Sequence, residues 1–110
     1  MTAQWHRICT MKDLEPNWGE AALIDGRQYA IFRAADDSIF VTSHRDPASG
    51  ALVIARGILG EKGGEPTVTS PLYKEVYSLM SGECLSGADY RLPVYSVEVR
   101  DGDIWAELPA

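Results

Sequence analysis

The chain has 110 residues, with Asp and Glu outnumbering Lys and Arg by 16 to 10 and a formal net charge of −6. This length corresponds to one domain, which buries roughly two thirds of the surface of its unfolded chain. The acidic balance argues against nucleic acid and anionic membrane surfaces as partners, because phosphate contacts require clustered cations. No apolar run approaches the ~20 residues that a membrane span needs.

Cysteine usage indicates the cellular compartment. Residues 1–7 lack a charged stretch followed by an apolar one, so no signal peptide is predicted. The two cysteines, Cys9 and Cys84, therefore indicate a reducing, cytoplasmic setting. We expect both to be free thiols packed in the core, and a disulfide between them is the alternative. Glu83 beside Cys84 disfavours a reactive thiolate.

The first part of the chain predicts an antiparallel meander. Short strands are expected at residues 5–10, 20–24, 27–33 and 38–42. Asp25-Gly26 joins the second and third of these into a hairpin, because Asp-Gly supplies the positive φ angles of a type I′ turn. Trp5 is expected in the core. Trp18, in a polar loop at residues 14–19, either covers the core or contacts a partner.

The middle of the chain is less regular. Residues 51–57 fit one or two helical turns ended by Gly57, or equally a buried strand, because the segment is too short for periodicity to decide. Residues 60–66 are polar and glycine-rich, which predicts a loop. Strands are expected at residues 67–69 and 75–79, on either side of another loop.

The last part of the chain returns to a meander. Strands at residues 94–100 and 103–108 are predicted to pair through a second Asp-Gly turn at Asp101-Gly102. Trp105 is expected in the core. Strands of this length and spacing favour an all-β sandwich or barrel, and no repeat, linker or long helix interrupts them.

Two loops carry the residues that invite a functional interpretation: Ser43-His44-Arg45-Asp46-Pro47 and Thr69-Ser70-Pro71-Leu72-Tyr73-Lys74. His44 and Asp46 with a second histidine would outline a non-haem iron site, but the only other histidine, His6, lies far upstream. We favour an Asx turn in which the Asp46 carboxylate accepts backbone N–H groups ahead of Pro47. No glycine-rich dinucleotide motif, four-cysteine set or nucleophile elbow is present in the sequence.

Together the two loops resemble the ligand loops of a Rieske [2Fe–2S] domain in which every ligand has been replaced. That family writes Cys-x-His and then Cys-Pro-x-His, which supplies two thiolates and two imidazoles. The corresponding positions here are His44, Asp46, Ser70 and Tyr73. The resemblance implies one all-β Rieske-like domain over residues 1–110, an antiparallel sandwich or barrel with a vestigial ligand-loop subdomain inserted at residues 43–79. It also implies no cluster.

Further stretches resemble one cluster-less branch of that family, the small subunit of assimilatory NAD(P)H-dependent nitrite reductase. They include residues 55–60, 70–74 and 77–85, whereas His44 departs from a branch that more often has Asn there. The resemblance implies a cytoplasmic small subunit in nitrate assimilation, docked on a large subunit. That partner would hold FAD, a [4Fe–4S] cluster and sirohaem and reduce nitrite to ammonium. It implies no catalytic, cofactor-binding or metal-binding residue in this chain.

The position of Tyr73 at the tip of its loop suggests two roles. The side chain either anchors a partner or fills the space that a cluster would occupy. We expect the loops holding His44, Asp46, Ser70 and Tyr73 to form the partner surface. Exposed tips or strand edges would also allow a homodimer. The alternatives to a nitrite reductase subunit are a Rieske-type ferredoxin for an oxygenase and a stand-alone regulatory module.

Overall fold

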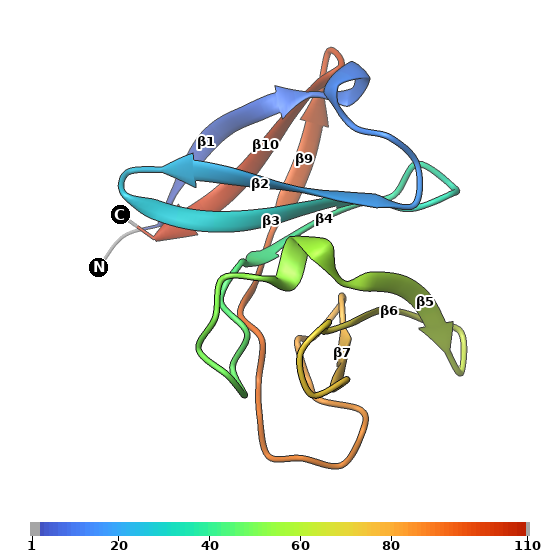
Figure 1. The fold of residues 1–110 in the computed structure, drawn as a ribbon. Coiled ribbons are helices and arrows are strands. Elements are labelled where there is room, and N and C mark those ends of the chain that lie inside the picture. The colour runs from blue at the N-terminus through green and yellow to red at the C-terminus, as the bar shows by residue number, and fades with distance from the viewer. Residues whose placement is uncertain (1–2, 110) are drawn as a thin grey trace.

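The computed structural model describes residues 3–109 and contains three antiparallel sheets (Figure 1). The first sheet has the order β1-β10-β9, with β1 at Ala3–Thr10, β10 at Asp103–Pro109 and β9 at Val97–Arg100. The second has the order β2-β3-β4-β8, with β2 at Trp18–Ile24, β3 at Arg27–Arg33, β4 at Ile39–Ser43 and β8 at Val94–Tyr95. The third has the order β5-β6-β7, with β5 at Ile58–Lys62, β6 at Glu65–Thr69 and β7 at Val76–Ser78.

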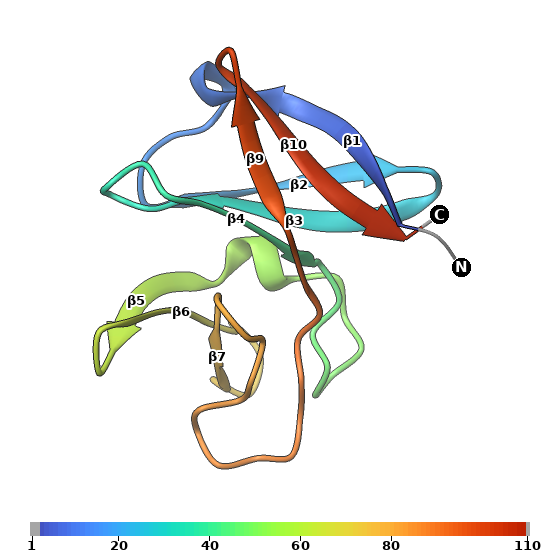
Figure 2. The same ribbon diagram turned by 180° about the vertical axis from the view of Figure 1, so that it is seen from behind.

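The first two sheets lie together at one end of the molecule and the third lies at the other (Figure 2). Two short 3₁₀ helices complete the secondary structure, η1 at Met11–Asp13 and η2 at Ile54–Arg56. Within residues 3–109, no helix is long and apolar enough to cross a membrane. The three antiparallel sheets confirm the predicted all-β architecture.

Strand β3 connects two hydrophobic cores because its side chains alternate between opposite faces of its sheet. Ala30 and Phe32 join the core shared with the third sheet, and Tyr29 and Ile31 join the core under the first sheet. All four side chains are at most 3% exposed. A strand buried on both faces ties the two ends of the molecule together.

The two predicted Asp-Gly hairpins are confirmed. Asp25 and Gly26 have φ angles of 50° and 79°, and Asp101 and Gly102 have 50° and 80°. Both residues of each turn thus lie in the left-handed region that a type I′ turn requires. The predicted strand at residues 94–100 is interrupted at Ser96, where the chain passes from the second sheet into the first.

The prediction of a loop at residues 60–66 was wrong. These residues form most of the β5–β6 hairpin, whose Gly63 and Gly64 have φ angles of 60° and 84°. Glycine composition predicted an irregular segment, but two adjacent glycines also satisfy a tight hairpin turn. Residues 51–57 contain the single helical turn η2, which Gly57 ends with an extended backbone.

The placement of Trp5 and Trp105 in the core was also wrong. Ile104, Ala106 and Leu108 are the buried residues of β10, so Trp105 between them points to the outer face of the sheet. The Arg100 guanidinium lies 5.2 Å from the Trp5 ring centroid and 4.8 Å from that of Trp105. The two rings are half-buried around this cation, an arrangement that strand alternation alone does not reveal.

Candidate functional site

The first ligand-type loop begins where β4 ends and is fixed by His44. The backbone N–H of His44 donates to the Gln28 carbonyl at 3.2 Å, and its carbonyl accepts the N–H groups of Val53 and Ile54. Its ring nitrogen Nδ1 accepts the Ala55 N–H at 3.1 Å. The imidazole therefore stays neutral with its proton on Nε2, and it holds η2 in place.

The electrostatic surroundings of His44 reinforce this state. Its side chain is 5% exposed. Burial lowers the pKa of His44 from its ordinary value, and the nearby Arg56 charge lowers it further. Nδ1 is thus engaged by the backbone of η2, and the ring serves to fix the loop.

Asp46 forms the predicted Asx turn. Its carboxyl Oδ1 accepts the Ala48 N–H at 2.9 Å, one residue beyond Pro47. The main chain of Asp46 closes the loop by accepting the Gly50 N–H at 2.7 Å and donating to Ala51. The side chain is completely buried, so a carboxyl group at this position needs a second partner.

That second partner comes from the other ligand-type loop. Ser70 Oγ donates to Asp46 Oδ2 at 2.7 Å in a buried contact between the two loops. Ser70 Oγ also accepts the Leu72 N–H at 3.2 Å, and the Ser70 N–H donates to the Glu75 carbonyl at 2.9 Å. A hydrogen bond thus joins two positions where a Rieske centre would have a histidine and a cysteine ligand. The sequence placed these positions in two loops, but it gave no sign of this contact.

Tyr73 does not fill the space between the loops. Its side chain is 73% exposed, and the neighbouring Leu72 is 41% exposed. Tyr73 and Lys74 have φ angles of 62° and 57°, a backbone region that non-glycine residues rarely occupy. The strained turn directs the aromatic ring outward, away from His44, Asp46 and Ser70. Of the two roles considered for Tyr73, filling the space between the loops is therefore excluded, and contact with a partner remains.

The buried aromatic residue beside the loops is Tyr77, on β7. Its side chain is completely buried, and its hydroxyl has no hydrogen-bond partner among residues 3–109. Burial raises the pKa of Tyr77, and the charge of Asp46 raises it further. Tyr77 therefore stays a neutral phenol that packs in the core next to the joined loops.

The donor atoms of these loops do not fit a Rieske [2Fe–2S] cluster, which requires two thiolates and two imidazoles. Both cysteines are free and lie elsewhere, Cys9 on β1 and the buried Cys84 after β7. Cys84 Sγ lies 3.1 Å from a Glu75 carboxyl oxygen. Burial raises the pKa of the Cys9 thiol. In the part of the chain that the structure describes, no three His, Cys, Asp or Glu residues are grouped so as to hold a metal ion.

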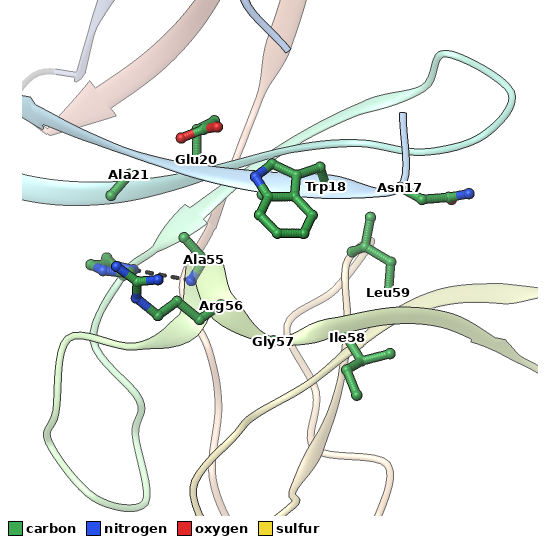
Figure 3. Close-up of a pocket in the computed structure, with 11 residues that line it drawn as sticks. Asn17, Trp18, Glu20, Ala21, Ala55, Arg56, Gly57, Ile58 and Leu59 are labelled. Atoms are coloured by element: carbon green, nitrogen blue, oxygen red, sulfur yellow. Dashed lines mark hydrogen bonds between the residues drawn. The ribbon is translucent and has the colours of Figure 1, made fainter. Parts of the chain in front are cut away.

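A cleft of about 890 Å³ opens beside the first loop (Figure 3). Residues 17–21 form one wall, residues 55–59 form the other, and His44 lines the cleft between them. A Cβ at Gly19 would lie 2.5 Å from the Ala55 carbonyl oxygen, so glycine allows η2 to approach β2. Trp18, which is 57% exposed, lies over this cleft rather than covering the core. The sequence left two roles open for Trp18, a cover over the core or a contact with a partner, and it did not predict the cleft.

Comparisons with known proteins decide the family. A model of the Rieske-like [2Fe-2S] domain matches residues 4–107. The nitrite reductase (NADH) small subunit of Salmonella typhimurium is 39% identical over 101 residues, which cover 91% of this chain and 94% of that protein. The chain belongs to the nitrite reductase small-subunit branch of the Rieske-like family.

The solved structures agree with this assignment. The crystal structure of a Mycobacterium tuberculosis protein, described as an NADH-dependent nitrite reductase small subunit, superposes with a TM-score of 0.91 at 37% identity. The superposition covers 100% of this chain and 99% of the Mycobacterium tuberculosis chain. A ferredoxin of carbazole 1,9a-dioxygenase from Nocardioides aromaticivorans has a TM-score of 0.77 at 20% identity, which shows the shared fold alone.

One relative in this family carries the domain within a longer polypeptide. The nitrite reductase [NAD(P)H] large subunit of Klebsiella oxytoca is 36% identical over 101 residues, which cover 92% of this chain and 10% of that protein. In that relative, a domain similar to this one is part of the large subunit itself.

Proposed function

We propose that this chain is the small subunit of a cytoplasmic NAD(P)H-dependent nitrite reductase and that it binds the large subunit without carrying a cofactor. The observation that carries the proposal is the buried hydrogen bond from Ser70 to Asp46, at positions where a Rieske centre needs metal ligands. The similarity to nitrite reductase small subunits over 91% of the chain supports the identity of the enzyme.

The reaction belongs to the large subunit in this proposal. That partner would bind FAD, a [4Fe–4S] cluster and sirohaem and reduce nitrite to ammonium with electrons from NAD(P)H. The small subunit would stabilise or orient it without carrying electrons. The Klebsiella oxytoca relative supports this arrangement, because there the same kind of domain is held next to the rest of the large subunit by covalent linkage.

Copurification is the most direct test of the proposed function. A tagged chain, isolated from cells grown on nitrate, is expected to bring with it a protein that contains flavin and sirohaem. The separated small subunit is expected to contain neither iron nor acid-labile sulfide and to lack the visible absorption of a Rieske centre. Stoichiometric iron and sulfide in anaerobically prepared small subunit would instead favour an electron carrier of the ferredoxin type.

The tip of the second ligand-type loop is the proposed contact surface. Tyr73 stands out from it, and tyrosine is enriched among the residues that dominate binding energies. The variant Tyr73→Ala should weaken binding to the large subunit at least tenfold. Tyr90→Ala is the matched control, because Tyr90 is also an exposed tyrosine (42%) but lies outside both loops. Equal affinities of the two variants would remove Tyr73 from the contact surface.

A further inference from the structure

Two sheets of the molecule each have an edge strand on one of the two walls of the cleft. Strand β2 is an edge of the second sheet, and β5 is an edge of the third. The cleft is lined by the beginning of each strand. In Figure 1, β5 continues from the helical turn η2, which lies below β2 in this view.

The register identifies the backbone groups of β2 that remain free. The His44 N–H donates to Gln28, and the Ala34 N–H donates to Ser38, so the even-numbered residues of β3 face β4. The odd-numbered residues of β3 therefore face β2, where they pair with its even-numbered residues. The N–H and C=O groups of Gly19, Ala21 and Leu23 consequently point away from the sheet.

The same reasoning applies to β5. Leu79 N–H donates to the Pro66 carbonyl, so Pro66 faces β7, and the residues on either side of it in β6 face β5. Their partners are Lys62 and Gly60, which leaves the backbone groups of Leu59 and Glu61 directed outward. The hydrogen bonds within residues 3–109 include no partner for these outward groups of β2 and β5.

The side chains around the cleft supply apolar contacts beside these free edges. Trp18 is 57% exposed and Ile58 is 72% exposed. Figure 3 shows the Trp18 ring between β2 and the segment at Ala55–Gly57, with the Leu59 side chain directed toward β2. Arg56 stands at the other end of the cleft from Leu59 (Figure 3), and its charge acts on His44, which also lines the cleft.

We propose that this cleft receives an extended segment of the large subunit, which pairs as an added strand with β2 or β5. The inference rests on the proposed function, because it takes the large subunit as the partner. In strand addition, the free N–H and C=O groups of the edge strand form hydrogen bonds with the main chain of the added segment. The flanking Trp18 and Ile58 provide side-chain contacts. The occupant is assigned to the large subunit because the Klebsiella oxytoca relative keeps that polypeptide attached to the same domain.

Binding variants test the apolar and the backbone parts of the proposal separately. Trp18→Ala and Ile58→Glu should each weaken binding to the full large subunit at least tenfold. Ala21→Pro removes one outward N–H without removing a hydrogen bond between β2 and β3, and it should weaken binding by a similar factor. Met80→Ala is the matched control, since Met80 is 64% exposed but lies outside this cleft, and it should bind like the unchanged protein.

Amide hydrogen exchange distinguishes strand addition from side-chain contact alone. In the free small subunit, the amides of Gly19, Ala21 and Leu23 should exchange much faster than those of the even-numbered residues between them. In the complex, protection should rise at least tenfold at alternate positions along β2, or at Leu59 and Glu61 along β5. Samples are exchanged as the complex, quenched and then separated for measurement. Absence of new protection on either strand would overturn the proposal, even if Trp18→Ala binds weakly.

The outcomes separate this inference from the proposed function. If the unchanged chain does not bind the large subunit, the proposed function fails. If it binds, and Trp18→Ala, Ile58→Glu and Ala21→Pro bind equally well, only the strand-addition proposal fails. Protection of the same amides in the isolated chain at high concentration, together with dimers in sedimentation, would show that a second copy occupies the cleft and would overturn the assignment to the large subunit.

Discussion

At the scale of the residue, a hydrogen bond between two buried side chains connects the two ligand-type loops. The Asp46 carboxyl receives one bond from within its own loop, at Ala48, and one from Ser70 across the gap. Both side chains have no exposed surface. The loops are therefore held together by oxygen atoms at positions where the related cluster-binding domains use a metal centre.

Loss of the Ser70 hydroxyl should leave the Asp46 carboxyl with an unsatisfied buried oxygen. We expect Ser70→Ala to lower the free energy of unfolding by about 2 kcal/mol, measured by urea denaturation. The double variant Asp46→Ala/Ser70→Ala should be less destabilised than the sum of the two single changes, because either change alone breaks the same contact. Strict additivity would contradict a direct interaction between the two residues.

His44 should make stability depend on pH. Its pKa in the folded chain is lowered from the ordinary value of 6.5, so below that pH the unfolded chain takes up a proton that the folded chain does not. Stability is therefore fully present above about pH 6.5 and falls as the pH is lowered through that value toward the folded pKa. Urea midpoints between pH 7.5 and pH 5 measure this decrease.

The control for this prediction is His44→Asn. An asparagine carbonyl can still accept the Ala55 N–H, but it does not titrate. The difference between the pH dependences of the variant and the unchanged chain isolates His44 from the other histidine, His6. Identical pH dependences would show that His44 titrates alike in the folded and unfolded chain.

At the scale of the element, the turn that presents Tyr73 carries backbone strain. Two consecutive non-glycine residues, Tyr73 and Lys74, have positive φ angles there. Glycine adopts this conformation without the steric cost that any Cβ imposes. Tyr73→Gly should therefore be about 1 kcal/mol more stable than Tyr73→Ala, measured by thermal or urea unfolding.

This comparison also separates stability from recognition. Both variants lack the tyrosine ring, so both should bind the large subunit more weakly than the unchanged chain. A Tyr73→Gly variant no more stable than Tyr73→Ala would mean that the positive φ angle costs nothing at this turn.

The elements that could be predicted from the sequence are those whose conformation depends on residues next to one another in the chain. The turns at Asp25-Gly26 and Asp101-Gly102 depend on residues that themselves accept positive φ angles, and both were predicted. The β5–β6 hairpin was missed because its Gly63-Gly64 turn was included in a glycine-rich loop. The outward direction of Trp105 was missed because it depends on which face of β10 packs on the core, and Arg100 completes its surroundings from another strand.

The candidate site shows the same division between local and long-range causes. The Asx turn at Asp46 could be predicted from Asp46 and Pro47 alone. The contact from Ser70 and the cleft beneath Trp18 join segments far apart in the chain, and no local pattern encodes them. The sequence resemblance located both loops, but it did not reveal how their replaced ligands interact.

At the scale of the whole molecule, β3 should make the two cores unfold together. Phe32 packs in the core of the third sheet, and the adjacent Ile31 packs in the core of the first. Phe32→Ala should lower the free energy of unfolding by about 3–5 kcal/mol, and the protein should still unfold in one transition. Calorimetry tests this by comparing the calorimetric and van't Hoff enthalpies.

The control for this prediction is Val99→Ala, since Val99 is 52% exposed on the edge strand β9. Its effect should be a small fraction of that of Phe32→Ala. Two separate transitions in the Phe32 variant would show that the third sheet unfolds independently of the rest.

The pairing of β1 with β10 has a consequence for how this domain can be linked to other chains. Ala3 lies opposite Pro109, so the backbone enters and leaves at one corner of the first sheet, on the opposite side of the molecule from the β5–β6 hairpin (Figures 1 and 2). A covalent extension from this corner therefore starts across the molecule from the β5–β6 hairpin. The same module can therefore serve as a separate polypeptide or as a segment of a longer one without a change in its proposed contact surfaces.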